Sequence, residues 1–263
     1  MNQPPSKYDQ HPNYDVHFEP CPKRIRVEFN GEVVADSCRA QYLRETKHLP
    51  VYYYPIDDVR CDFLIATDHI SHCPFKGDAS YWTVKVGDRE AQNAVWSYKQ
   101  PYPEVSEIRD YLAFYWDNMD HWYEEDEEVF VHARDPKVRL DILDSFRPVQ
   151  VTVSGQVVAY TNRARLLFET GLPTRYYLPQ DDVHMDFLQA SDFQTSCPYK
   201  GTANYWHLKL GNEIYRDLVW SYPDPAPEAL RIKRYLCFFN ENVGAIHIDG
   251  TETERPITKW SLK

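Results

Sequence analysis

The sequence repeats itself with an offset of 124 residues. The segment Cys73–Trp82 returns as Cys197–Trp206 with seven of ten positions identical, and Val95–Tyr98 returns unchanged as Val219–Tyr222. A repeat of this length matches the common size of a globular domain. The sequence therefore predicts a tandem duplication, with an N-terminal arm at residues 1–23, a first repeat at 24–140 and a second repeat at 141–263.

Composition limits the classes of partner. The formal net charge is −11, and the acidic run Glu124–Glu128 repels phosphate backbones and anionic lipid surfaces. We therefore expect no nucleic-acid partner and no membrane partner, although such a run is also typical of a solvated linker or strand edge. The chain has no stretch of 18 apolar residues and its start lacks the apolar centre of a signal peptide, which favours a soluble cytoplasmic protein. The oligomeric state stays open.

Each repeat has the pattern of a β domain. Ile25, Val27 and Phe29 alternate before an Asn-Gly turn, and apolar residues resume at Val33, which predicts a hairpin with a type I′ turn. The second copy repeats this pattern from Val151. Aromatic or β-branched segments separated by turn residues predict further strands near 41–45, 51–54, 60–65, 81–86 and 94–98.

One short helix interrupts this pattern in each repeat. Proline in the first turn, followed by glutamate, predicts a helix at Pro103–Arg109, and its counterpart begins at Pro227. The segment Tyr111–Trp116 either continues the helix or forms a strand, and its aromatic content favours a strand. The fold class is therefore all-β, with one short helix per repeat.

The repeated Cys-Pro-aromatic-Lys-Gly segment predicts a shaped loop, because proline fixes one backbone angle and glycine frees another. Within it, Lys76 can lower the thiol pKa of Cys73 and make it a nucleophile, or bind an anionic group. The alternative is a buried cysteine beside a lysine at the rim, retained for folding. The second copy places Cys197 and Lys200 at the same positions.

Metal binding is a weaker interpretation. His69, His72 and Cys73 have the spacing of metal ligands, but only the cysteine persists in the second copy, which favours a surface histidine pair. The six cysteines include no Cys-x-x-Cys pair, so we expect reduced thiols, no zinc knuckle and no cofactor.

Aromatic residues form the other candidate site. Trp82, Trp96 and Tyr98 fall on neighbouring predicted strands and can converge into an aromatic wall that stacks flat ligands, although they serve equally as core. Glu45 lies inside a predicted strand, where a carboxylate needs a partner, and Arg39 is near it in sequence. The Asp57-Asp58 pair is more typical of a turn. The second copy supplies the equivalent set Glu169, Trp206, Trp220 and Tyr222.

These motifs resemble the family known as domain of unknown function 427. The resemblance rests on Ser71–Gly77, the Tyr-Trp pair, Val-Trp-Ser-Tyr and Ala113–Trp116, and it extends in two copies from about Lys23 to Trp260. It implies two tandem β-tent-like domains, similar in shape to methionine-R-sulfoxide reductases and to the drug-binding domain of cereblon. Those proteins hold zinc through Cys-x-x-Cys pairs that this sequence lacks. The family's nucleotidyltransferase-like label finds no Gly-rich phosphate loop here.

Three functions remain open. The leading expectation is a small-molecule site in which Trp82, Trp96 and Tyr98 hold the ligand, with Lys76 as counter-charge and Glu45 opposite. The alternatives are an enzyme, a hydrolase or transferase, with a lysine-activated cysteine nucleophile, and a module that binds protein partners. The copies also differ at His72, Thr83 and Lys99, which predicts that one site has lost its role.

Overall fold

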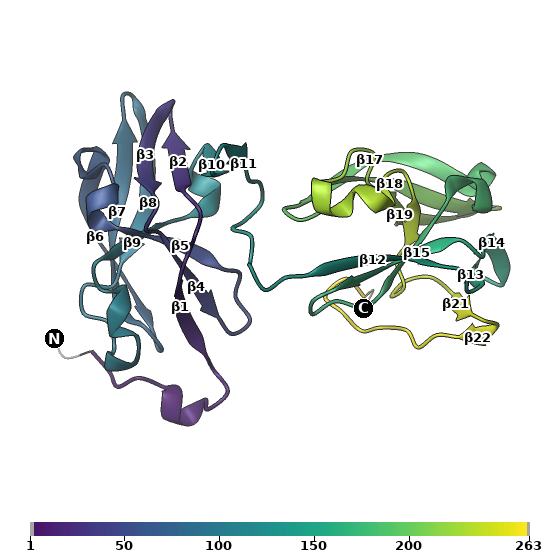
Figure 1. Ribbon diagram of the computed structural model, residues 1–263, viewed down its shortest axis with the longest axis horizontal. Helices are drawn as coiled ribbons and strands as arrows, with labels where there is room; N and C mark the ends of the chain where they lie inside the picture. Colours follow the sequence, from purple (N-terminus) through teal and green to yellow (C-terminus); the bar gives the residue numbers. More distant parts are fainter. Residues whose placement is uncertain (1–2, 262–263) are drawn as a thin grey trace. The chain divides into compact units, whose positions relative to one another are not determined.

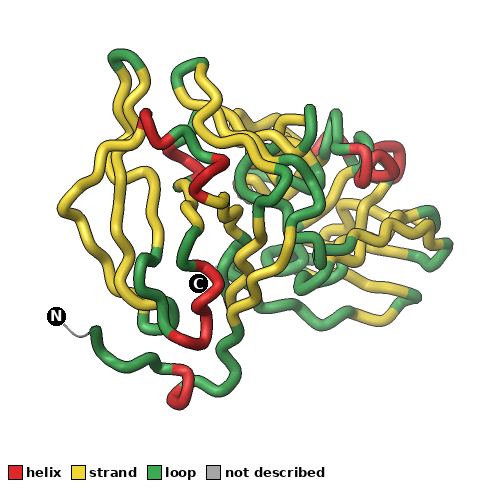
Figure 2. The backbone as a smooth tube through the Cα atoms, turned by 60° about the vertical axis from the view of Figure 1, so that its left-hand side comes forward, coloured by secondary structure: helices red, strands yellow, loops and turns green. Residues whose placement is uncertain are grey.

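A computed structural model describes residues 3–261 and divides the chain into two compact units, one ending at Asp135 and the other beginning at Pro136 (Figure 1). We call these the first unit and the second unit. Strands and loops make up most of the chain, and the helical segments are short (Figure 2). No helix among residues 3–261 is long and apolar enough to cross a membrane.

The first unit contains two antiparallel sheets. Its four-stranded sheet has the order β11-β10-β2-β3, with bounds Glu127–Glu128, His121–Glu124, Ile25–Phe29 and Glu32–Ser37. Its seven-stranded sheet has the order β1-β4-β5-β9-β8-β7-β6, with bounds Val16–Pro20, Gln41–Glu45, Val51–Pro55, Tyr111–Phe114, Arg89–Ser97, Gly77–Val86 and Leu64–Cys73.

The second unit has the same topology. Its four-stranded sheet has the order β14-β13-β21-β22, with bounds Gln156–Thr161, Val149–Val153, Ala245–Ile248 and Thr251–Glu252. Its seven-stranded sheet has the order β12-β15-β16-β20-β19-β18-β17, with bounds Leu140–Ser145, Ala164–Glu169, Arg175–Leu178, Leu236–Phe238, Glu213–Ser221, Gly201–Leu210 and Leu188–Cys197. The predicted all-β class and duplication are confirmed.

The helical segments within residues 3–261 are 3-10 turns. The two longest have six residues each and fall where the sequence predicts helices: η4 at Pro103–Ile108 and η8 at Pro227–Ile232. The others have three residues each: Tyr8–Gln10, Ile56–Asp58, Cys61–Phe63, Trp116–Asn118, Gln180–Asp182 and Met185–Phe187.

The local predictions mostly hold. Asn30 and Gly31 both have positive φ, as the type I′ hairpin turn between β2 and β3 requires. The segment Tyr111–Phe114 is a strand. The predicted strand at 60–65 is wrong, because Cys61–Phe63 forms a 3-10 turn and β6 begins only at Leu64. An Arg60 to Asp62 ion pair spans this turn.

Each seven-stranded sheet carries an apolar cluster on both of its faces. In the first unit one cluster lies between the two sheets and includes Val27, Tyr54 and Phe114. The other cluster lies on the opposite face and includes Tyr53 and Tyr81. The second unit repeats this arrangement. Since residues alternate between the faces of a strand, this opposite face is where Glu45, Trp96 and the Cys-Pro loop meet.

Candidate functional site

The Cys-Pro-aromatic-Lys-Gly segment is a tight turn between two long strands in each unit. In the first unit the Lys76 amide donates to the Cys73 carbonyl at 3.3 Å, and Gly77 has φ +102°. A side chain at Gly77 would meet the Gln100 carbonyl at 3.3 Å, so both backbone angle and space require glycine. The second unit repeats these features at Lys200 and at Gly201, where φ is +93°.

The turn lysine is bound by a carboxylate in both units. The Lys76 ammonium bonds Glu45 of β4, and their side chains are 10% and 8% exposed. The Lys200 ammonium bonds Glu169 in the same way. The structure thus brings Lys76 and Glu45 into direct contact, whereas the sequence predicted them as opposite sides of a ligand. Arg39, the other predicted partner of Glu45, instead bonds Asp58.

The N-terminal arm covers this turn in the first unit. The Lys7 amide donates to the Pro74 carbonyl at 3.0 Å. The Tyr14 ring stacks on Phe75 with the ring centres 3.6 Å apart, and its hydroxyl donates to Glu45. Burial and the bond to Glu45 raise the pKa of Tyr14 above its usual range. Glu45 therefore has two partners, and the Lys76 charge is neutralised inside the protein.

An aromatic wall stands beside this ion pair in both units, with Tyr115 in the first unit where the second has Phe239. In the first unit the Trp96 indole donates to the Tyr53 hydroxyl at 3.2 Å and packs 4.5 Å from the Tyr115 ring centre. In the second unit the Trp220 indole donates to Tyr177 at 3.2 Å and packs 4.5 Å from Phe239. Strand register is also identical, since Val51 pairs with Leu43 and Arg175 pairs with Leu167.

The tyrosines of the wall are neutral phenols. Burial raises the pKa of Tyr53 and Tyr98 well above the usual range. Burial and the hydrogen bond with Tyr81 raise the pKa of Tyr115 to about 12. The wall is therefore uncharged at neutral pH.

The structure does not bring every predicted tryptophan to this wall. Tyr81, and not Trp82, pairs with Trp96, and cross-strand partners share a face. Trp82 pairs with Val95 and packs against the cluster between the sheets, where Lys99 lies 5.1 Å from its ring centre. Trp206 has the equivalent position in the second unit.

A cavity of about 990 Å³ opens beside the wall of the first unit. Its lining includes the predicted site residues Glu45, Cys73, Lys76, Trp96 and Tyr98. It also includes residues that sequence reasoning did not select, among them Val51, Tyr53, Tyr115 and Asp117. The volume lies at the upper end of the roughly 300–1,000 Å³ of small-molecule sites, and an apolar lining with few polar groups is typical of them.

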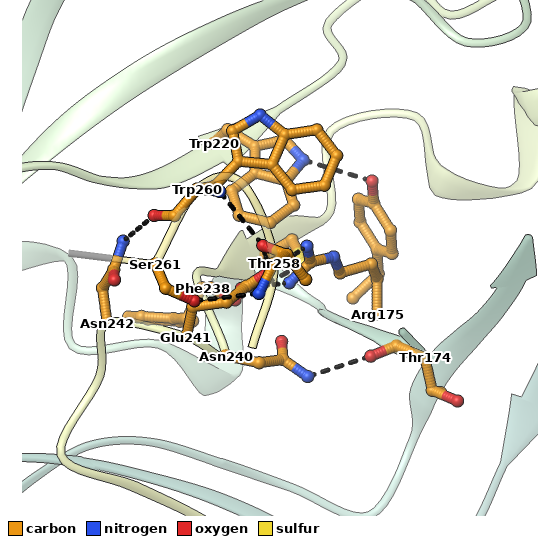
Figure 3. Close-up of polar contacts among 12 residues, drawn as sticks. Thr174, Arg175, Trp220, Phe238, Asn240, Glu241, Asn242, Thr258, Trp260 and Ser261 are labelled. Atoms are coloured by element: carbon orange, nitrogen blue, oxygen red, sulfur yellow. Dashed lines mark hydrogen bonds and ion pairs between the residues drawn. The ribbon is translucent and has the colours of Figure 1, made fainter. Parts of the chain in front are cut away.

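The second unit fills the corresponding place with its own side chains (Figure 3). Arg175, at the position of Val51, lies 5.6 Å from the Trp220 ring centre. Its guanidinium donates twice to Glu241, at 2.6 and 2.7 Å. Glu241 is at the position of Asp117, and its side chain is fully buried.

The C-terminal segment closes over this pair. Thr258 donates to Glu241 at 2.7 Å, and Arg175 lies 5.8 Å from the Trp260 ring centre (Figure 3). The Asn242 amide donates to the Trp260 carbonyl at 3.1 Å. We call residues 253–261 the C-terminal strap. Arg175 is therefore held between two indole rings and a carboxylate, an arrangement that suits a guanidinium.

The cysteines differ in their surroundings. Cys73 and Cys197 are partly exposed, and within residues 3–261 neither thiol has a hydrogen-bond partner. The Lys76 ammonium is bound to Glu45, and the Nδ1 atom of His72 lies 2.6 Å from Asp78. Neither side chain is placed to act as a base on a thiol. Burial raises the pKa of Cys237 to about 12, which makes it inert.

A metal centre has no support among residues 3–261. They contain no group of three or more His, Cys, Asp or Glu side chains placed to hold a metal ion. His69 packs 4.5 Å from Tyr81 instead.

The residues that distinguish the two sites lie outside the repeated motifs, so the motifs do not point to them. Position-by-position comparison at the offset of 124 pairs Val51 with Arg175 and Asp117 with Glu241. An arginine at an apolar strand position is a detectable signal, since it needs a buried partner. The strap begins with the hydrogen bond that Val129 makes in the first unit, but its Thr258 and Trp260 stand where the first copy has Arg134 and Pro136.

The family model for domain of unknown function 427 (DUF427) matches residues 17–125 and again residues 141–249. The chain belongs to the DUF427 family. It is a tandem member, and the two matches cover the two units in turn. The arm at residues 3–15 and the strap lie outside the matched ranges. No curated protein matches the chain.

Proposed function

We propose that the first unit of this DUF427 protein binds a small molecule with a flat apolar part, and that the second unit is a structural copy whose site is filled internally. The ligand lies against Trp96 and Tyr115, in the cavity that the Val51 side chain is too short to fill. The observation that carries this function is the contrast between the cavity of about 990 Å³ and the buried Arg175 to Glu241 pair at the equivalent place.

Three features of the first unit support this function. The cavity is lined by aromatic rings that stack flat groups at little cost in conformational entropy. The hydrogen bond to Tyr53 fixes the orientation of Trp96, and Tyr115 packs against this indole, so the wall is formed before a ligand arrives. The Lys76 to Glu45 pair adds a polar but neutral edge.

A lysine counter-charge for an anion has less support. Lys76 is already bonded to Glu45, and Lys200 makes the same bond where the cavity is filled. A contact common to both units is explained by folding, because it fastens the turn to β4 or β15. A cysteine nucleophile is likewise not favoured, since no base contacts Cys73 within residues 3–261.

The test uses the full chain labelled with 5-fluorotryptophan. The chain has seven tryptophans, and each is expected to give its own ¹⁹F signal. Variants Trp96→Phe and Trp220→Phe assign the two signals of interest. Titration with indole is expected to shift the Trp96 signal and to leave the Trp220 signal unchanged.

The matched variants separate binding from folding. Val51→Arg places the arginine of the second unit in the first and is expected to abolish the shift at Trp96. Val51→Leu keeps an apolar residue and is expected to retain it. An unchanged Trp96 signal in the unmodified chain, or an equal shift in the Val51→Arg chain, contradicts the function.

A further inference from the structure

The second unit contains a built-in occupant of the site. The Arg175 guanidinium lies near the Trp220 ring, within reach of Trp260, and donates two hydrogen bonds to the Glu241 carboxylate. The guanidinium is thus stacked on aromatic faces and paired in the bidentate geometry that this planar cation favours. The protein itself shows which chemical group its aromatic wall accepts.

The first unit has the same frame without this group. Trp96 and Tyr53 keep the hydrogen bond that Trp220 and Tyr177 make. The turn that carries the carboxylate is also retained, because the Asn118 amide donates to Tyr115 as the Asn242 amide donates to Phe239. Asp117 lines the cavity from this turn and is exposed.

Asp117 also differs from Glu241 in its partners. Within residues 3–261 it forms no ion pair, whereas Glu241 has both Arg175 and Thr258. Its side chain is one methylene shorter, which leaves room between the carboxylate and the wall. Within residues 3–261 the first unit therefore has the counterpart of the Trp220 ring and the carboxylate, and has Val51 at the position of the arginine.

We infer that the ligand of the first unit carries a guanidinium group, which stacks on Trp96 and bonds the Asp117 carboxylate. This inference rests on the proposed function and names the chemical class of its ligand. A guanidinium fits better than a simple ammonium because its plane stacks on an indole and its fork matches a carboxylate. The net charge of −11 further favours a cationic ligand.

The other charges of the lining are consistent with this class. Glu45 and Lys76 neutralise each other. The His72 ring is paired with Asp78. Lys47, His48 and His132 also line the cavity. The Lys47 charge is exposed and would favour an anion instead.

The test compares three probes of nearly equal shape: benzylguanidinium, benzylammonium and neutral N-benzylurea. Their dissociation constants are measured from the ¹⁹F shift of Trp96 in the full chain. Benzylguanidinium is expected to bind about tenfold more tightly than N-benzylurea, as one charge-assisted bidentate contact permits, and more tightly than benzylammonium. Asp117→Asn is expected to remove the preference, so that benzylguanidinium and N-benzylurea bind equally.

The outcomes separate this inference from the proposed function. Equal binding of benzylguanidinium and N-benzylurea, both abolished by Val51→Arg, contradicts the guanidinium class and leaves the small-molecule site standing. A preference that persists in Asp117→Asn contradicts the role of this carboxylate. If benzoate binds more tightly than all three probes, and Lys47→Gln removes this binding, the ligand is an anion and the inference of a cationic ligand is overturned. If no probe shifts the Trp96 signal, the proposed function itself fails.

Discussion

The two units share one frame and differ in what fills it. Both keep the glycine turn, the lysine to glutamate pair and the tryptophan to tyrosine hydrogen bond. The second has a buried guanidinium, a fully buried carboxylate and a strap whose Thr258 and Trp260 contact them. What both units keep is explained by folding, and what separates them marks the place where we propose that a ligand binds. The motif most easily recognised in the sequence is therefore not the motif that distinguishes the site.

The largest difference in stability between the two units is expected when the carboxylate at this position, Glu241 or Asp117, is removed. Glu241→Ala leaves Arg175 buried without its partner, and we expect a loss of about 3–5 kcal/mol in the free energy of unfolding of the second unit. Asp117→Ala removes an exposed side chain, and we expect a change within about 0.5 kcal/mol. Urea denaturation, with hydrogen exchange to locate the unfolding unit, measures both.

The double variant Arg175→Val with Glu241→Gln gives the second unit the apolar residue of the first and removes both charges of the pair together. Its cost is therefore expected to be smaller than that of Glu241→Ala alone, which leaves the Arg175 charge buried without its partner. Equal losses in the free energy of unfolding for Glu241→Ala and Asp117→Ala would show that the Arg175 to Glu241 pair does not stabilise the second unit more than Asp117 stabilises the first.

An intermediate effect is expected from the ion pair that the two units share. Lys76→Met and Lys200→Met each leave a buried glutamate without its ammonium, and we expect each to cost about 1.5–3 kcal/mol. Thermal unfolding of the two variants measures this. A loss of indole binding in Lys76→Met without any loss of stability would instead give the lysine a direct role in the site.

The smallest difference is expected in the pH dependence of stability. Burial acts to raise the pKa of Glu241, but the bonds from Arg175 and Thr258 prevail and hold it below its ordinary value of 4.5. This group therefore stabilises the second unit above about pH 4.5, and its contribution is lost as the pH falls further.

The first unit has carboxylates of its own that act in the same pH range. Arg24, Arg60 and Arg89 lower the pKa values of Asp36, Asp62 and Asp120. The contribution of Glu241 is therefore measured within the second unit. Hydrogen exchange of this unit between pH 6 and pH 3 is expected to show a steeper loss of protection in the unmodified chain than in Glu241→Gln, and an equal loss in the two chains would contradict this assignment.

The fold was largely predictable because its signals are local. Turn residues such as Asn30 and Gly31, and the alternation in β2, specify elements without reference to the rest of the chain. The arrangement of the site residues was less predictable from the sequence. Whether Tyr81 or Trp82 faces Trp96 depends on the register between β7 and β8, and a shift of one residue exchanges the two faces.

The partner of Glu45 shows the same limit. Arg39 is closer to it in sequence than Lys76, yet Arg39 bonds Asp58, because a 3-10 turn brings that carboxylate to it. The closure of the second site depends on the strap, which comes from the far end of the chain. Long-range contacts of this kind are set by packing and not by nearby sequence.

The most direct measurement of open against filled sites uses dissolved oxygen, a small apolar paramagnet that enters accessible apolar space. The ¹⁹F relaxation rates of 5-fluorotryptophan at Trp96 and Trp220 are compared under air and under oxygen pressure. We expect oxygen to increase the relaxation rate strongly at Trp96 and weakly at Trp220, which is only 6% exposed. Equal increases at the two indoles, or a larger increase at Trp220, would contradict an open first site and a filled second site.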